Sequence, residues 1–154
     1  MIYDGPGLFA SPRVWWLFHI VMGAPNVFVL DGGLDGWKAE GRPLETATPS
    51  FAPAIFTPKF NADRVVSLDE MREIVDSRSL QIADARSGGR FAATEPEPRE
   101  GMRSGHMPGA RSLPSGVFAT NGKFKSLPEL KETIEKAGID LEKPVVTTCG
   151  SGIT

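Results

Sequence analysis

The stretch Pro144-Val145-Val146-Thr147-Thr148-Cys149-Gly150-Ser151-Gly152-Ile153-Thr154 joins a short apolar run to a turn of small residues. An apolar run of this length is typical of a strand buried in a parallel sheet. The turn after it can direct successive backbone N–H groups at a negatively charged sulfur. We therefore predict an α/β fold with an open parallel sheet, in which Cys149 follows a strand and acts as a nucleophile.

The alternative for Cys149 is a buried structural cysteine, because cysteines outside disulfides are among the most buried residues. Gly150 and Gly152 favour the nucleophile, since they leave the sulfur uncovered and let backbone amides approach a ligand closely. The chain contains one cysteine among 154 residues, which excludes an intramolecular disulfide and a multi-cysteine metal site. We expect neither a metal nor another cofactor.

The same α/β pattern extends upstream of this stretch. Residues 80–84 and 110–113 predict strands, and a long charged loop over residues 87–109 separates them. Helices are expected after Ser67 and after Ser126, because each serine is followed three positions later by a glutamate, the capping-box pattern.

The first part of the chain contains an incomplete copy of this order of strands and helices. Ser11 is the expected N-cap of a helix whose first residue is Pro12. Residues 27–30 predict a short buried strand. Prolines then alternate with threonine, serine and alanine over residues 46–63, which predicts an extended linker.

Composition excludes several functional classes. The formal net charge of −2 offers no basis for non-specific binding of nucleic acid. The longest apolar stretch, residues 14–22, is interrupted by His19 and is too short to span a bilayer. The first residues lack the basic and apolar regions of a signal peptide. We expect a cytoplasmic protein without nucleic-acid or membrane partners, and an organellar origin stays open.

Charged residues follow the strand predicted at 80–84. Ligands of open α/β sheets bind at the carboxyl ends of strands, and an arginine fork suits a carboxylate or a sulfur oxyanion, so Arg86, Arg90 and Arg99 are candidates. Asp84 is expected to bind loop amides or Arg86, with an acid–base role as the alternative. His106 is interpreted as a residue that stabilises a turn, and the glutamates of the loop as solvated surface.

Several segments carry a family resemblance together. They are Tyr3-Asp4-Gly5, Ser11-Pro12-Arg13-Val14-Trp15-Trp16, Leu30-Asp31-Gly32-Gly33-Leu34, Gly36-Trp37, Asp84-Ala85-Arg86, Gly89-Arg90-Phe91, Thr94-Glu95-Pro96-Glu97-Pro98-Arg99, Gly105-His106-Met107-Pro108-Gly109-Ala110 and the last six residues. This ordered set resembles the tandem-domain rhodanese superfamily, and within it the 3-mercaptopyruvate sulfurtransferases. The resemblance implies two partly present domains, residues 1–45 and 64–154, joined by a linker at 46–63.

The resemblance also implies a sulfurtransferase that works through a persulfide. Cys149 would take sulfur from 3-mercaptopyruvate and pass it to cyanide or to a thiol such as thioredoxin, with Ser151 in a proton relay. Arg90 and Arg99 would bind the carboxylate and carbonyl oxygens of the substrate. The residues of the turn that would also contact the substrate are Gly150, Gly152, Ile153 and Thr154. Asp84, Arg86 and His106 would support the site.

The relay partners of Ser151 belong, in the family, to the early part of the first domain, which this chain lacks. We therefore expect an internal fragment that is weakly active or inactive by itself. Rhodaneses that use thiosulfate typically have bulky basic residues after the cysteine, where this chain has Gly150 and Ser151. A thiosulfate:cyanide sulfurtransferase and a non-catalytic rhodanese-like binding module remain the alternatives. A related phosphatase would need an arginine just beyond Thr154.

Overall fold

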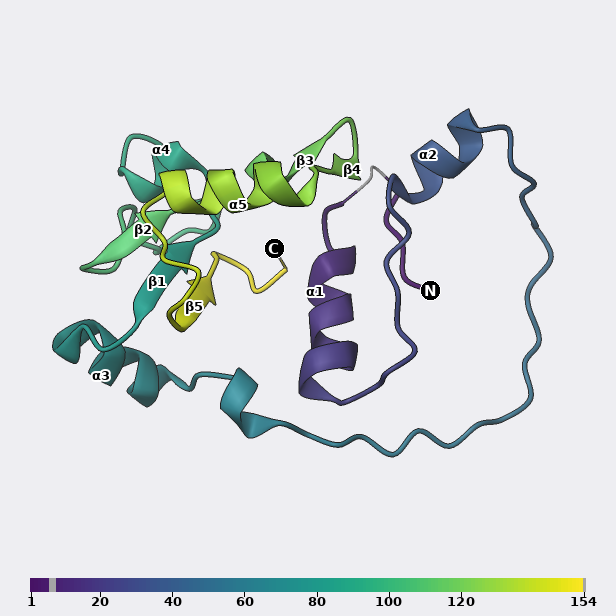
Figure 1. Ribbon diagram of the computed structural model, residues 1–154, viewed down its shortest axis with the longest axis horizontal. Coiled ribbons are helices and arrows are strands. Elements are labelled where there is room, and N and C mark those ends of the chain that lie inside the picture. The colour runs from purple at the N-terminus through teal and green to yellow at the C-terminus, as the bar shows by residue number, and fades with distance from the viewer. Residues whose placement is uncertain (6–7, 154) are drawn as a thin grey trace. The chain divides into compact units, whose positions relative to one another are not determined.

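A computed structural model describes residues 1–5 and 8–153 (Figure 1). The chain divides into two compact units, Met1–Val65 with Asn121–Lys123, and Val66–Thr120 with Phe124–Thr154. Among the described residues, no helix is both long enough and apolar enough to cross a membrane.

The second unit contains a parallel sheet of three strands in the order β2-β1-β5 (Figure 1). The strands are β1 (Gln81–Asp84), β2 (Ala110–Ser112) and β5 (Val145–Thr148). All three lie within a residue or two of the predicted runs. The register pairs Asp84 with Ser112 on one side and with Thr148 on the other, so the carboxyl ends of the strands meet at one edge.

Helices cover both faces of this sheet. They are α3 (Leu68–Ser77) and α5 (Leu127–Lys136). Ile82 packs in a cluster with Ile74 of α3, whereas its neighbour Ala83 packs with Ile139, which follows α5. Consecutive side chains of a strand point to opposite faces, so β1 is buried from both sides. This confirms the predicted α/β fold, an open parallel sheet flanked by helices.

Both helices begin at the predicted capping boxes. The hydroxyl of Ser67 accepts a hydrogen bond from the N–H of Glu70 at 3.3 Å, and the Glu70 carboxylate accepts one from the N–H of Ser67 at 2.7 Å. These bonds lower the pKa of Glu70. Ser126 and Glu129 form the equivalent box at α5.

The segment predicted as a continuous loop, residues 87–109, includes a one-turn helix, α4 (Gly88–Phe91). It forms because the hydroxyl of Ser87 accepts a hydrogen bond from the N–H of Arg90. The remaining short elements of this half are η3 (Ser115–Phe118), β3 (Ala119–Thr120) and β4 (Lys123–Phe124).

Apart from Lys123 of β4, the elements of the first unit that the structure describes are helical. They are α1 (Ser11–Trp15), η1 (Trp16–Val21), α2 (Gly33–Ala39) and η2 (Ala62–Arg64). The predicted N-cap at Ser11 is wrong, because Ser11 is the first helical residue and Ala10 is the N-cap. The side chain that accepts hydrogen bonds from N–H groups at the start of α1 is Asp4, and not Ser11. Its Oδ2 accepts from the N–H groups of Phe9, Ala10 and Ser11 at 2.7, 2.9 and 2.8 Å.

The strand predicted at residues 27–30 is reduced to a single parallel bridge between Ile2 and Val29. Residues 46–61, within the predicted linker, form no helix or strand and are exposed. The end of this segment is anchored within the first unit, because the N–H of Lys59 donates to the carbonyl of Met22 at 2.9 Å.

Candidate functional site

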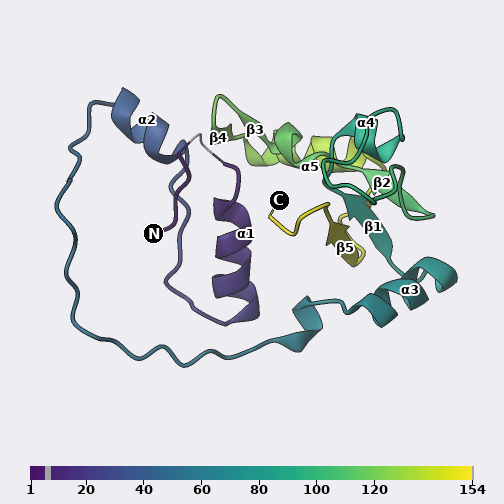
Figure 2. The same cartoon turned by 180° about the vertical axis from the view of Figure 1, so that it is seen from behind.

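The carboxyl edge of the sheet brings several of the predicted site residues together. Asp84 is the last residue of β1, and Cys149 directly follows β5, which lies beside β1 in both Figures 1 and 2. The N–H of Ala85 donates to the carbonyl of Thr148 at 2.8 Å, which extends the pairing to the start of the turn. Ligands of open parallel sheets bind at this kind of edge.

Cys149 is half-buried, and the turn after it folds back onto its sulfur. The N–H of Gly152 lies 2.9 Å from Sγ and donates to it. Gly152 has a φ of +73°, a conformation that side chains rarely adopt. An N–H group directed at sulfur stabilises a thiolate, the reactive form of cysteine. Of the other predicted turn residues, Ser151 and Ile153 are exposed, whereas Thr154 lies outside the described residues.

Arg86 is held by three partners. Its Nη2 donates to Asp84 Oδ2 and to the carbonyl of Gly105, both at 2.6 Å, and its Nη1 donates to Glu97 Oε1 at 2.7 Å. The Nε group also donates to the Asp84 carboxylate. The hydrogen bonds with Asp84 are the main reason why the pKa of Arg86 is raised. Every nitrogen of this guanidinium therefore serves the structure of the loop.

Arg90 uses only one edge of its guanidinium in this way. Its Nε and Nη2 donate to the two carboxylate oxygens of Glu97 at 3.1 and 2.5 Å, which raises the pKa of Arg90. Among the described residues, none accepts a hydrogen bond from Nη1 of Arg90. A Cβ at position 150 would overlap Nη2, so glycine is needed there for Arg90 to lie against the turn.

Glu97 is a residue of the site that the sequence analysis missed. Its side chain is 1% exposed and accepts hydrogen bonds from both Arg86 and Arg90. The bond from Arg90 is the main reason why its pKa is lowered. The interpretation of the loop glutamates as solvated surface is therefore wrong for Glu97. Its flanking residues, Pro96 and Pro98, were the available signal, because prolines restrict the backbone of an ordered loop.

The other predicted polar residues differ in their surroundings. The Asp84 carboxylate is 1% exposed and bound by Arg86, so it lies where a substrate has no access. The rings of His106 and Phe91 stack with their centroids 3.8 Å apart, and Nδ1 of His106 lies 2.9 Å from the carbonyl oxygen of Phe91. These contacts tie His106 to α4. Arg99 is exposed, and within the described part of the chain no ion pair includes it.

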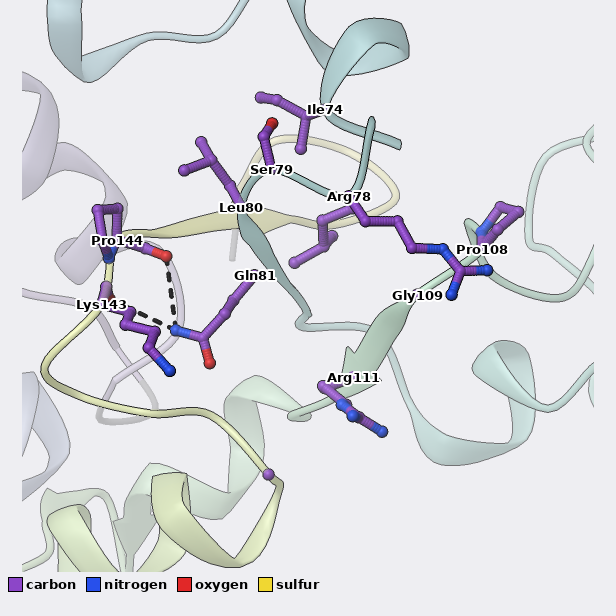
Figure 3. Close-up of a pocket in the computed structure, with 12 residues that line it drawn as sticks. Ile74, Arg78, Ser79, Leu80, Gln81, Pro108, Gly109, Arg111, Lys143 and Pro144 are labelled. Carbon is purple, nitrogen blue, oxygen red and sulfur yellow. Dashed lines mark hydrogen bonds between the residues drawn. The ribbon is translucent and has the colours of Figure 1, made fainter. Parts of the chain in front are cut away.

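A cleft of about 400 Å³ lies at the opposite edge of the sheet, near the amino ends of the strands. Figure 3 shows Gln81, the first residue of β1, hydrogen-bonded to the carbonyl groups of Lys143 and Pro144 beside this cleft. None of the predicted site residues lines it. The predicted site residues therefore lie away from this cleft.

Comparison with known families identifies the fold family of the chain. The model of the rhodanese-like domain matches residues 67–154, more than half of the chain and the whole segment from α3 to the cysteine turn. The chain belongs to the rhodanese-like domain family. The resemblance inferred from the sequence is thereby confirmed.

Rhodanese-like relatives match the whole chain. It is 40% identical to mouse 3-mercaptopyruvate sulfurtransferase over 157 residues, which cover 100% of this chain and 52% of the relative. It is 39% identical to chicken thiosulfate sulfurtransferase over 158 residues, covering 100% of this chain and 53% of the relative. The chain thus spans about half the length of these relatives.

A crystal structure of SseA, a 3-mercaptopyruvate sulfotransferase from Escherichia coli, is also similar to this rhodanese-like chain. The two align with a TM-score of 0.85 and 33% sequence identity, over 99% of this chain and 56% of SseA. The rhodanese fold predicted from the sequence is confirmed by this agreement.

Proposed function

We propose that this chain carries the nucleophilic cysteine of a sulfurtransferase, which moves sulfur from 3-mercaptopyruvate to a thiol such as thioredoxin, or to cyanide. The main support is the turn at the carboxyl edge of the sheet, where the N–H of Gly152 is directed at Cys149 Sγ. The names of the mouse and Escherichia coli relatives support the choice of donor. Residues 1–45 and 64–154 would be parts of two domains joined at 46–63.

The proposed reaction has two steps at Cys149. Its thiolate attacks the thiol sulfur of 3-mercaptopyruvate, so a sulfur–sulfur bond forms and the carbon–sulfur bond breaks. The electron pair stays on carbon as the enolate of pyruvate, which takes up a proton and leaves as pyruvate. An acceptor thiolate then attacks the outer sulfur, and the Cys149 thiolate is the leaving group. Ser151, two residues after Cys149, would belong to the relay that supplies the proton.

The contacts of the arginines support different roles for Arg86 and Arg90. Arg86 uses all its nitrogens within the protein, so it supports the loop. Arg90 lies against the turn at Gly150 and binds Glu97 through one edge, so Nη1 is the donor we assign to the substrate carboxylate. Arg99, exposed on the same loop, is proposed to bind the carbonyl oxygen.

Intact-protein mass spectrometry tests this proposal. Because weak activity is expected of this chain by itself, prolonged incubation with 3-mercaptopyruvate should add the mass of one sulfur atom at Cys149 slowly, and a thiol should remove it. The Cys149→Ser variant is the matched control and should gain nothing. Persistent absence of the added sulfur on the wild-type chain, while iodoacetamide still alkylates Cys149, would overturn the proposal.

A second candidate is transfer from thiosulfate, which is supported by the 39% identity to chicken thiosulfate sulfurtransferase. In that reaction the outer sulfur of thiosulfate moves to Cys149 and sulfite leaves. The small residues Gly150 and Ser151 favour 3-mercaptopyruvate, because they offer no cation to a doubly charged donor. The initial rates of persulfide formation with the two donors decide between them, and no persulfide from either donor would favour a non-catalytic binding module.

A further inference from the structure

Glu97 is a buried carboxylate to which the proposed sulfur transfer assigns no step. Its Oε1 accepts hydrogen bonds from Arg86 Nη1 at 2.7 Å and from Arg90 Nε at 3.1 Å, and its Oε2 accepts from Arg90 Nη2 at 2.5 Å. Both oxygens are thus bound, and the side chain is 1% exposed. Such complete pairing gives Glu97 one well-defined position.

We propose that Glu97 is a positioning residue, which binds one edge of the Arg90 guanidinium and so presents the remaining Nη1 donor to a carboxylate at the Cys149 turn. This inference rests on the proposed function, because it concerns the same site and an anionic sulfur donor. Glu97 acts through Arg90 and does not touch the substrate.

The position of Glu97 is itself determined by the end of β1. Asp84 binds Arg86, and Arg86 binds both Glu97 and the carbonyl of Gly105. The four side chains Asp84, Arg86, Glu97 and Arg90 form a continuous row of ion pairs, here called the ion-pair cluster. A long arginine side chain has many conformations of similar energy, and pairing with a fixed carboxylate selects one of them.

The charges of the ion-pair cluster cancel, because it contains two carboxylates and two guanidinium groups. A substrate anion therefore gains little from the net charge of the cluster. What remains to attract it is Nη1 of Arg90, which is not bound by Glu97 and belongs to a guanidinium whose Nη2 lies against Gly150 of the turn. The orientation of Arg90, which Glu97 determines, is thus the property that recognition of a carboxylate needs.

Alkylation of Cys149 measures this recognition without turnover. Iodoacetate and iodoacetamide react alike, since the thiolate displaces iodide and a sulfur–carbon bond forms, but only iodoacetate carries a carboxylate. The chain has one cysteine, so both rates report on Cys149. We expect Arg90→Gln to lower the ratio of the iodoacetate rate to the iodoacetamide rate about tenfold, as for loss of a charge-assisted hydrogen bond.

A double-mutant cycle then tests Glu97. In the Glu97→Gln and Glu97→Asp backgrounds, the effect of Arg90→Gln on this ratio is expected to fall to about twofold or less, because Arg90 is no longer oriented. Glu97→Asp keeps the negative charge but, with a shorter side chain, moves the carboxylate away from Arg90. It therefore separates the effect of the carboxylate's position from the effect of its charge. The effect of Arg99→Gln serves as the control and should be the same in all backgrounds.

Each outcome is decisive for Glu97. An unchanged effect of Arg90→Gln in either Glu97 background, or none in the wild-type chain, would overturn the proposal. Failure of both Glu97 variants to fold, judged by thermal unfolding and by the iodoacetamide rate, would make Glu97 a structural residue and overturn it as well. If the coupling is found but no persulfide forms, the proposed function fails alone; if a persulfide forms without coupling, only this inference fails.

Discussion

Arg86 and Arg90 are the same residue type four positions apart, and their surroundings give them different tasks. Arg86 binds Asp84, Glu97 and the carbonyl of Gly105, and its side chain is 12% exposed. Among the described residues, the guanidinium of Arg90 binds Glu97 alone, and it lies against Gly150. At the scale of single residues, the number of donors already in use separates an arginine that stabilises the loop from one available to a ligand.

Removing Arg86 should therefore cost stability. Arg86→Ala leaves the Asp84 carboxylate, which is 1% exposed, without its cation, and breaking such a pair typically costs about 3–5 kcal/mol of the free energy of unfolding. Urea denaturation measures this loss. Arg72→Ala is the matched control, because Arg72 pairs with Asp69 at the surface and should cost less than about 1 kcal/mol. Equal losses in the two variants would contradict the role given to Arg86.

The ion-pair cluster should also make stability depend on pH. Because the bond from Arg90 lowers the pKa of Glu97 below its usual value of 4.5, the folded protein protonates Glu97 less readily than the unfolded chain. Ionised Glu97 therefore adds to the free energy of unfolding above pH 4.5, and this contribution is lost as the pH falls through the lowered folded value. The stability difference between the wild-type chain and Glu97→Gln should shrink accordingly. A difference that stays constant down to strongly acidic pH would refute this.

The sequence allowed the cysteine turn to be predicted but not Glu97. Cys149 is followed by two glycines within three residues, a local pattern with a direct chemical meaning. Glu97 stands among charged and proline residues that look like any solvated loop. Its burial depends on Arg86 and Arg90, seven or more positions away, and single-sequence patterns do not report such contacts.

At the scale of elements, capping determines where the helices of the second unit begin. Ser67→Ala removes the acceptor for the N–H of Glu70 at the start of α3 and should lower the free energy of unfolding by about 1 kcal/mol. Ser50→Ala, in the exposed segment without helix or strand, is the control and should have no measurable effect. Urea denaturation of both variants checks this, and the idea fails if the two are equally stable.

The elements that were predicted correctly have local signals, and the others depend on distant partners. The capping boxes at Ser67 and Ser126 lie within four residues and were recognised. Residues 27–30 have an apolar composition suited to a strand, but they pair with Ile2 at only one position. The β3–β4 hairpin was missed although Asn121 and Gly122, both with positive φ, form a characteristic hairpin turn.

At the scale of the whole molecule, the chain has two compact units, and a long exposed segment belongs to the first. Phe51 is 84% exposed within this segment, so chymotrypsin should cut the native chain there first. Lys59 and Asn61 are bound through their backbone to Met22 and Val21, which should protect the following residues. Peptide mapping of early digests tests this, with Phe51→Ser as the control that should slow the first cut. A first cut inside α3 would contradict it.

The order of the strands in the sheet could not be predicted from the sequence patterns. The runs at 80–84 and 144–148 predict buried strands, yet nothing in either run shows that β1 and β5 are neighbours. The expected burial is wrong for β5, which lies at the edge of the sheet with Val145 41% exposed. The apolar runs predict a parallel sheet but not the order of its strands, because strand order is a property of the whole fold and is not encoded in one segment.

The pairing of β1 with β5 also has a consequence for the rate at which the protein folds. Gln81 pairs with Val145 and Asp84 with Thr148, residues more than sixty positions apart. Helices α3 and α5 form from local contacts, whereas this ladder must first close a long loop, which makes it slow. The cysteine turn is therefore among the last parts to be assembled during folding. Until the ladder closes, Cys149 is an ordinary exposed thiol, open to oxidation before its partners are in place.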